Sequence, residues 1–128
     1  MLVRDAMSGV VLTVGPAHSL REAARQMSTR GVGAAVVHDG DVDGLGIITE
    51  RDVLHAVGAG QDPNEEQVGD HLTTDLVFAS PDMTLQEAAA LMTRGGFRHL
   101  VVLDAGEVVG IVSVRDIVRQ WAEAAIRS

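Results

Sequence analysis

The amino-acid sequence contains one unit of about 60 residues written twice. Four residues of the first copy recur 65 positions later: Pro16, Ser19, Glu22 and Met27 match Pro81, Thr84, Glu87 and Met92. Further along the separation is 64, where Gly46, Arg51 and Asp52 match Gly110, Arg115 and Asp116. The slip falls in an acidic, glycine-containing stretch and predicts a surface turn, because turns tolerate insertions. The duplication predicts two half-folds that complete one core, and two related sites.

The size and composition of the chain exclude several classes of protein. Its 128 residues amount to one ordinary domain, whereas two free-standing halves would each be marginal. There is no cysteine and no lysine, so disulfides, thiolate chemistry, a Schiff-base lysine and a P-loop lysine are excluded. A formal net charge of −8 and only 2% aromatic residues argue against a nucleic-acid-binding protein.

No segment of the sequence predicts membrane insertion or export. No apolar run approaches the roughly 20 residues that span a bilayer. The first residues, Met1 to Asp5, lack the basic and long apolar regions of a signal peptide. We therefore expect a cytoplasmic protein without membrane partners.

Each copy predicts the order strand, helix, strand, strand, helix. Capping sequences begin the first helices at Ser19 and Thr84, each with a glutamate three residues later, and apolar stripes follow at helical spacing. Gly31 and Gly95-Gly96 predict the ends of these two helices. The predicted elements are strands at 10–14, 34–37 and 45–48 and helices from 19 and 49, then strands at 76–79, 99–103 and 108–112 and helices from 84 and 113. The repeats then occupy residues 1–60 and 67–128, joined by a linker at 61–66.

The last predicted helix carries an apolar face that runs past the end of the repeat. The residues of this face are Ile117, Val118, Trp121, Ala122 and Ala125. Such a face either contacts a partner chain or covers the core of its own chain, and the sequence leaves both interpretations open.

One signature occurs at both predicted strand-to-helix junctions. Gly46-Ile47-Ile48-Thr49-Glu50-Arg51-Asp52 recurs as Gly110-Ile111-Val112-Ser113-Val114-Arg115-Asp116. A hydroxyl residue followed three residues later by an acid is also a helix cap with a purely structural role. Duplication, the preceding strand and the arginine favour an anion site instead, because a helix N-terminus offers free amides and a favourable dipole. A hydroxyl and an arginine suit a phosphate there, and an aspartate suits the hydroxyls of a ribose.

With these signatures, the chain resembles a tandem pair of CBS domains, the cystathionine-β-synthase-type repeat that forms a Bateman module. The resemblance covers residues 3 to 120. The other matching features are Val3-Arg4-Asp5 and Val68-Gly69-Asp70, Glu22-Ala23-Ala24 and Glu87-Ala88-Ala89, and Arg98-His99-Leu100-Val101-Val102. The resemblance implies an α+β fold of two βαββα units, packed through their sheets about a pseudo-two-fold axis. It also implies two clefts between the repeats, in which family members bind AMP, ATP, other adenosyl compounds or nothing.

The resemblance also implies which residues would contact a ligand. Thr49 and Asp52 would contact phosphate or ribose in one cleft, and Ser113 and Asp116 would do so in the other. Arg51 and Arg115 would be phosphate partners, and the backbone at Leu12-Thr13 and Val77-Phe78 would border the adenine. The family further implies a homodimer and an unknown regulated protein, with no required cofactor.

The two copies differ where a phosphate would bind. Arg98-His99 begins the second strand of copy two, where copy one has Gly33-Ala34. Two groups that can carry positive charge could bind phosphate directly, although exposed polar residues at a strand end are also ordinary. The sequence therefore predicts unequal clefts, with Arg98 and His99 enriching one of them in positive charge.

A second motif points to a different chemistry. Asp39-Gly40-Asp41-Val42-Asp43-Gly44, followed after five residues by Glu50, fits the calcium loop of an EF-hand. The flanking residues 34–37 predict a strand rather than a helix, and the second copy lacks the pattern. We therefore interpret this stretch as an acidic hairpin turn and keep calcium binding as a lesser alternative.

The sequence predicts a regulatory or sensor module that binds an adenine nucleotide. The alternative of another class is an oligomerisation scaffold with empty clefts. Nothing in the sequence resembles a nucleophile elbow, a Walker A loop or an acid–base pair of carboxylates, so we do not expect an enzyme.

Overall fold

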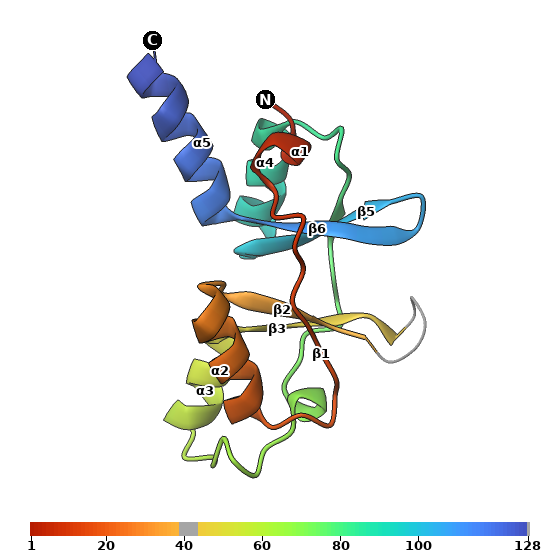
Figure 1. Ribbon diagram of the computed structural model, residues 1–128, viewed down its shortest axis with the longest axis vertical. Coiled ribbons are helices and arrows are strands. Elements are labelled where there is room, and N and C mark those ends of the chain that lie inside the picture. Colours follow the sequence, from red (N-terminus) through yellow and green to blue (C-terminus); the bar gives the residue numbers. More distant parts are fainter. Residues whose placement is uncertain (39–43, 128) are drawn as a thin grey trace. The chain divides into compact units, whose positions relative to one another are not determined.

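The computed structural model describes residues 1–38 and 44–127. The chain forms two compact units, Leu12–Leu76 and a second unit that joins Met1–Val11 to Val77–Ser128. Each unit contains a three-stranded sheet and helices, which confirms the expected α+β class (Figure 1). Among the described helices, none combines the length and apolarity that crossing a membrane requires.

The unit Leu12–Leu76 carries the first repeat. Its sheet has the order β1-β2-β3, with β1 parallel to β2 and β2 antiparallel to β3. The helices α2 and α3 lie on one side of this sheet in Figure 1. The elements are β1 (Thr13–Val14), α2 (Leu20–Arg30), β2 (Ala34–Val37), β3 (Gly46–Thr49), α3 (Glu50–Gly58) and the short 3₁₀ helix η2 (Val68–Asp70). The strand expected at 10–14 is therefore shorter than its β-rich sequence indicated.

The predicted boundaries of α2 are confirmed, but its capping box is only half formed. The Ser19 hydroxyl accepts the Glu22 amide at 3.1 Å, and Gly31 ends the helix in the left-handed conformation with φ 67°. The Glu22 carboxylate does not complete the box by reaching back to Ser19. It accepts instead from Arg25 and Gln26, because side chains three and four residues apart are neighbours on a helix.

The unit that joins Met1–Val11 to Val77–Ser128 carries the second repeat. Its sheet has the order β4-β5-β6, with the same parallel and antiparallel pairings. The elements are α1 (Val3–Ala6), β4 (Phe78–Ala79), α4 (Leu85–Gly95), β5 (His99–Asp104), β6 (Glu107–Ser113) and α5 (Val114–Arg127). The Thr84 hydroxyl accepts the Glu87 amide at 3.1 Å, as Ser19 does for Glu22, and Gly96 ends α4 with φ 70°.

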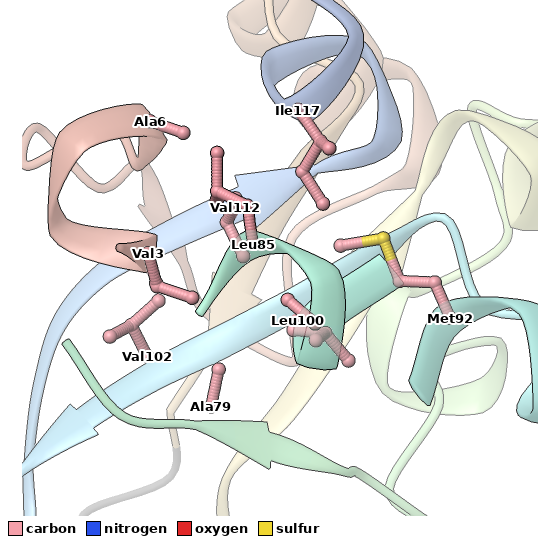
Figure 2. Close-up of a cluster of buried hydrophobic side chains, with 10 residues drawn as sticks. Val3, Ala6, Ala79, Leu85, Met92, Leu100, Val102, Val112 and Ile117 are labelled. Carbon is pink, nitrogen blue, oxygen red and sulfur yellow. The ribbon is translucent and has the colours of Figure 1, made fainter. Parts of the chain in front are cut away.

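The two cores are built from corresponding residues. The predicted stripes supply Leu20, Ala23 and Met27 to one core and Leu85, Ala88 and Met92 to the other. Figure 2 shows the second of these cores, where Leu85 and Met92 of α4 meet Leu100, Val102 and Val112 of the sheet. Alternation along the strands buries one face of each sheet against its helices.

The first residues of each repeat, 1–11 and 67–76, form its leading segment. Each leading segment packs in the core of the unit that carries the other repeat. Val3, at the start of the chain, is fully buried beside Leu85, and Val68 is fully buried beside Leu20. The Val3 amide donates to the Met83 carbonyl at 2.7 Å, and the Val68 amide donates to the His18 carbonyl at 2.8 Å.

Further along, these segments add a bridge to each sheet, where Ser8 pairs with Ile111 and Thr73 pairs with Ile47. The repeats that the duplication defines in the sequence are therefore not the compact units. Residues 1–11 begin the first repeat yet complete the unit of the second, and residues 67–76 begin the second repeat yet complete the unit of the first.

Candidate functional site at two strand-to-helix junctions

Both copies of the signature lie where a strand runs directly into a helix. Thr49 ends β3 and is the N-cap of α3, and Ser113 ends β6 immediately before α5. We call the stretch Thr49–Asp52 the first junction and the stretch Ser113–Asp116 the second junction.

The first junction is a complete capping box. The Asp52 amide donates to the Thr49 hydroxyl at 3.2 Å, and the Asp52 carboxylate accepts the Thr49 amide at 2.9 Å. The Thr49 hydroxyl also donates to this carboxylate, at 3.0 Å. Both side chains are half-buried. Their structural role is therefore shown, and a role in binding stays a prediction.

The second junction has the same geometry and one additional partner. The Asp116 carboxylate accepts the Ser113 amide at 2.8 Å, and the Asp116 amide donates to the Ser113 hydroxyl at 3.0 Å. Arg119 forms an ion pair with the other carboxylate oxygen of Asp116 at 3.2 Å. Sequence reasoning missed Arg119, although its spacing of three residues from Asp116 on a helix was a usable signal. An ionised carboxylate has about four acceptor positions, so these bonds leave room for a ribose hydroxyl.

Packing within each unit explains why the signature begins with a glycine. A Cβ at Gly110 would lie 2.7 Å from the backbone oxygen of Ser8, and one at Gly46 would lie 2.7 Å from Leu72 Cδ1. Both neighbours belong to the leading segments that complete each unit. The glycine therefore admits the close approach of another backbone, and it is no evidence for a ligand.

The structure brings Arg98 and His99 to the second junction. His99 pairs with Ser113 across β5 and β6, and the Val114 amide donates to the Arg98 carbonyl at 2.9 Å. Arg98 is exposed and His99 is half-buried. Arg98 and His99 therefore lie beside the strand end that carries Ser113, within one unit.

Gly33 and Ala34 occupy the corresponding places at the first junction. Ala34 pairs with Thr49, and the Glu50 amide donates to the Gly33 carbonyl at 2.9 Å. The two junctions thus share one backbone design and differ in their side chains.

The residues expected to border the adenine differ in their exposure. Thr13 and Phe78 are exposed and open β1 and β4. By the pairing register Phe78 shares a sheet face with His99 and Ser113, and this face is opposite the core face that carries Ala79.

Leu12 and Val77, which precede Thr13 and Phe78, differ from each other in burial. Leu12 is buried in the core of its unit, and its carbonyl accepts the Val36 amide at 2.9 Å, whereas Val77 is exposed. Only the exposed members of the predicted set offer side-chain surface to a ligand.

The two signature arginines lie in the first turns of α3 and α5. Both Arg51 and Arg115 are exposed. The phosphate contact of these two arginines stays a prediction.

The structure does not support the EF-hand context. The calcium pattern's residues 39–43 lie outside the described residues. On either side the chain forms β2 and β3, an antiparallel pair, where a calcium loop needs two helices. Within residues 1–38 and 44–127, no three histidine, aspartate or glutamate side chains gather to hold a metal ion.

These features define a class: a tandem α+β module with two related strand-to-helix junctions. The CBS-domain family model matches the chain twice, at residues 3–59 and 68–123. The chain is 36% identical over 117 residues to the CBS domain-containing protein YhcV of Bacillus subtilis, a match that covers 90% of this chain and 81% of YhcV. The chain therefore belongs to the CBS-domain family, as a pair of CBS domains.

Other relatives differ in length. The chain is 34% identical over 124 residues to the uncharacterised protein MJ1225 of Methanocaldococcus jannaschii, a match that covers 94% of this chain and spans 44% of MJ1225. Activities of such longer proteins therefore do not transfer from the match alone.

Two solved structures are similar over nearly the whole chain. One is the CBS domain pair of protein MJ0100 in complex with 5′-methylthioadenosine and S-adenosyl-L-methionine. It has a TM-score of 0.84 and 26% identity, and the match covers 97% of this chain and 98% of that one. The other is a hexameric CBS-CP12 protein from bloom-forming cyanobacteria, with a TM-score of 0.86 and 25% identity over 92% of this chain and 69% of that one.

Proposed function

We propose that this chain is a regulatory module that binds an adenine nucleotide at its two strand-to-helix junctions. Hydroxyl, carboxylate and arginine groups of the junctions would hold ribose and phosphate, and the starts of β1 and β4 would border the adenine. The residues proposed for binding are Thr49, Arg51, Asp52, Ser113, Arg115, Asp116, Arg98, His99, Leu12, Thr13, Val77 and Phe78.

The observation that carries this proposal is the grouping at the second junction. Within one unit, residues that carry a hydroxyl, a carboxylate, a guanidinium and an imidazole are neighbours along the backbone at the start of α5, because His99 pairs with Ser113 and the Val114 amide donates to the Arg98 carbonyl. A helix N-terminus with adjacent basic groups favours an anion. The adenosyl compounds bound by the MJ0100 pair support the adenine-containing class of ligand.

The proposed role is regulatory and not catalytic. A ligand that binds one arrangement of the module better than another shifts the population toward that arrangement, by no more than its difference in affinity. A regulated protein would respond to this shift. The scaffold alternative predicts no such ligand response.

Thermal unfolding with a panel of ligands tests the proposal. The panel contains AMP, ADP, ATP, S-adenosylmethionine, Mg²⁺ and Ca²⁺. A ligand that binds only the folded state adds about 2.7 kcal/mol of stability at a concentration 100-fold above its Kd. We expect an adenine compound to raise the Tm. No rise with any adenine compound would favour the scaffold, and a rise with Ca²⁺ alone would favour the calcium alternative.

We also propose that the module forms a homodimer through α3 and α5. Leu54 and Val57 of α3 are 68% and 50% exposed, and their counterparts Val118 and Trp121 of α5 are 55% and 43% exposed. Large apolar side chains repeated at equivalent places on two helices are costly to leave in water and mark a contact surface. The similar CBS-CP12 protein is hexameric, which supports the proposal of an oligomer.

Light scattering of the purified chain tests the dimer. Trp121→Glu should convert dimers to monomers while the far-ultraviolet circular dichroism is unchanged. Glu123→Gln, at an exposed residue on the same helix, serves as the control. A monomeric wild-type chain at high micromolar concentration would contradict the proposal.

A further inference from the structure

The first junction carries a carboxylate in the space beside Gly33, the position that corresponds to Arg98. A Cβ built on Gly33 would lie 3.0 Å from Cδ of Glu50 and 3.1 Å from its Oε1, so the Glu50 carboxylate packs over this glycine. Gly33 itself is buried. The absence of a side chain at position 33 therefore makes room for the acid.

The second junction has the opposite arrangement. Position 98 carries an arginine, and Val114 replaces the glutamate at the start of the helix. Both junctions keep their signature arginine and aspartate. The sign of the local charge is reversed by two differences. Gly33 corresponds to Arg98, and Glu50 corresponds to Val114.

The net charge of the two units differs in the same direction. The unit Leu12–Leu76 contains 11 aspartates and glutamates against 4 arginines, so its formal charge is −7. The other unit contains 7 acids against 6 arginines, so its formal charge is −1. An approaching anion therefore meets repulsion at the first junction both from Glu50 and from the unit that holds it.

We infer that the two junctions bind adenine compounds of different charge. The second junction binds a 5′-phosphorylated adenosine, and the first junction binds an adenosyl compound without phosphate, either neutral or carrying a cationic group at its 5′ end. The inference rests on the proposed function, since it assigns a ligand class to each of its two junctions.

Charge separates the two ligand classes while the common parts of the ligand are recognised alike. Thr49 with Asp52 and Ser113 with Asp116 have the same capping geometry, so neither pair distinguishes one ribose from the other. A phosphate gains charge-assisted hydrogen bonds from Arg98 and would face the Glu50 carboxylate at the other junction. A sulfonium or a neutral thioether encounters no repulsion from Glu50. Specificity thus comes from the repulsive group as well as from the attractive one.

Calorimetry with AMP and with 5′-methylthioadenosine tests the inference on the full chain. These two compounds share adenosine and differ in the charge at the 5′ position. We expect each to bind with one equivalent per chain, and saturation with 5′-methylthioadenosine should leave AMP affinity unchanged. Raising the salt concentration should weaken AMP binding and leave 5′-methylthioadenosine binding nearly constant.

Charge variants assign each ligand to its junction. Arg98→Ala should weaken AMP about tenfold, the effect of losing about one charge-assisted bond, and should leave 5′-methylthioadenosine unaffected. Glu50→Gln keeps the size of the side chain and should allow a second equivalent of AMP to bind. Arg94→Ala and Glu65→Gln are the matched controls, because they make the same charge changes at exposed residues of the same two units and should alter neither ligand.

The outcomes separate this inference from the function on which it rests. If AMP and 5′-methylthioadenosine compete for the same equivalent, or if Arg98→Ala weakens both alike, the charge assignment is wrong while nucleotide binding stands. If Glu50→Gln and Glu65→Gln behave identically, Glu50 does not select the ligand and the inference fails. If neither compound binds, the proposed function fails and the inference fails with it.

Discussion

The backbone oxygen of Ser8 lies 2.7 Å from the point that a Cβ on Gly110 would occupy. The two residues belong to segments about 100 positions apart, yet Ser8 and Ile111 exchange two backbone hydrogen bonds, of 2.9 and 3.1 Å. Thr73 and Ile47 exchange the equivalent pair in the other unit, at 2.8 and 2.9 Å. The glycine of the signature is therefore the position where the leading segment of the other repeat attaches to the sheet.

Gly110→Ala should destabilise the protein by about 1–3 kcal/mol, because the neighbour is backbone and can give way only by moving the segment. Urea denaturation measures the change. Gly58→Ala is the control, since a Cβ there meets nothing within 4 Å and the residue ends α3. The explanation fails if Gly110→Ala and Gly58→Ala have equal stability.

Removing the buried valine of a leading segment should weaken the unit that it completes. Val3→Ala and Val68→Ala each delete buried apolar groups that cost roughly 0.8 kcal/mol apiece, with a further cost for the cavity. Hydrogen exchange should show faster exchange in β5 and β6 for Val3→Ala, and in β2 and β3 for Val68→Ala. The reverse pattern, with each variant affecting the repeat that follows it in the sequence, would contradict the exchange of segments.

Two N-cap variants separate the structural role of the junctions from the proposed binding role. Ser113→Ala and Thr84→Ala each remove a hydroxyl that accepts a helix amide, so each should lower stability by about 0.5–2 kcal/mol. Only Ser113→Ala should also weaken AMP, measured by calorimetry at a temperature where both variants are folded. Equal AMP affinity in the two variants would show that Ser113 acts only as a helix cap and does not contact the ligand.

Stability should respond to pH through Glu22. Hydrogen bonds from Arg25, and then from Gln26, lower the pKa of the Glu22 carboxyl from 4.5 to about 2. The folded state favours the ionised form, so this stabilisation is present above pH 4.5 and is lost as the pH falls toward 2.

Glu22→Gln should therefore be less stable than the wild type at pH 6, and the gap should close near pH 2. Urea titrations at both values measure the gap. Arg25→Gln should show the same pH dependence, because it removes the first partner of the carboxylate. A gap that is the same at pH 6 and pH 2 would show that the ion pair on α2 contributes nothing.

Local patterns in the sequence predicted most elements of the fold. Helical periodicity and glycine conformation are local properties of the chain. For this reason the sequence could predict the buried stripe of Leu20, Ala23 and Met27 and the left-handed Gly31. The slip in the repeat falls between β2 and β3, where the acidic turn was expected. The patterns could not predict which of several neighbouring groups a side chain contacts. Glu22, for example, pairs with Arg25 and not with the N-cap residue Ser19.

The candidate site was predicted only as a set of residues. The equivalence of Arg98-His99 with Gly33-Ala34 followed from the duplication, and the register of His99 with Ser113 confirmed that this difference lies at a junction. The Glu50 carboxylate over Gly33 could not be predicted from spacing, because the contact joins residues of two different segments of the fold. The ion pair of Arg119 with Asp116 is different, because its spacing of three residues on a helix could have predicted it.

The sequence by itself determined the duplication, the capped helices and the difference between Gly33-Ala34 in one copy and Arg98-His99 in the other. Each is a property of residues close together in the chain or of residue type. Only the tertiary structure decided that Val3 belongs with Leu85 and Val68 with Leu20. That choice follows from burial and backbone pairing between distant segments. No local pattern encodes it, because a valine can be buried in either core and the rest of the chain decides in which one.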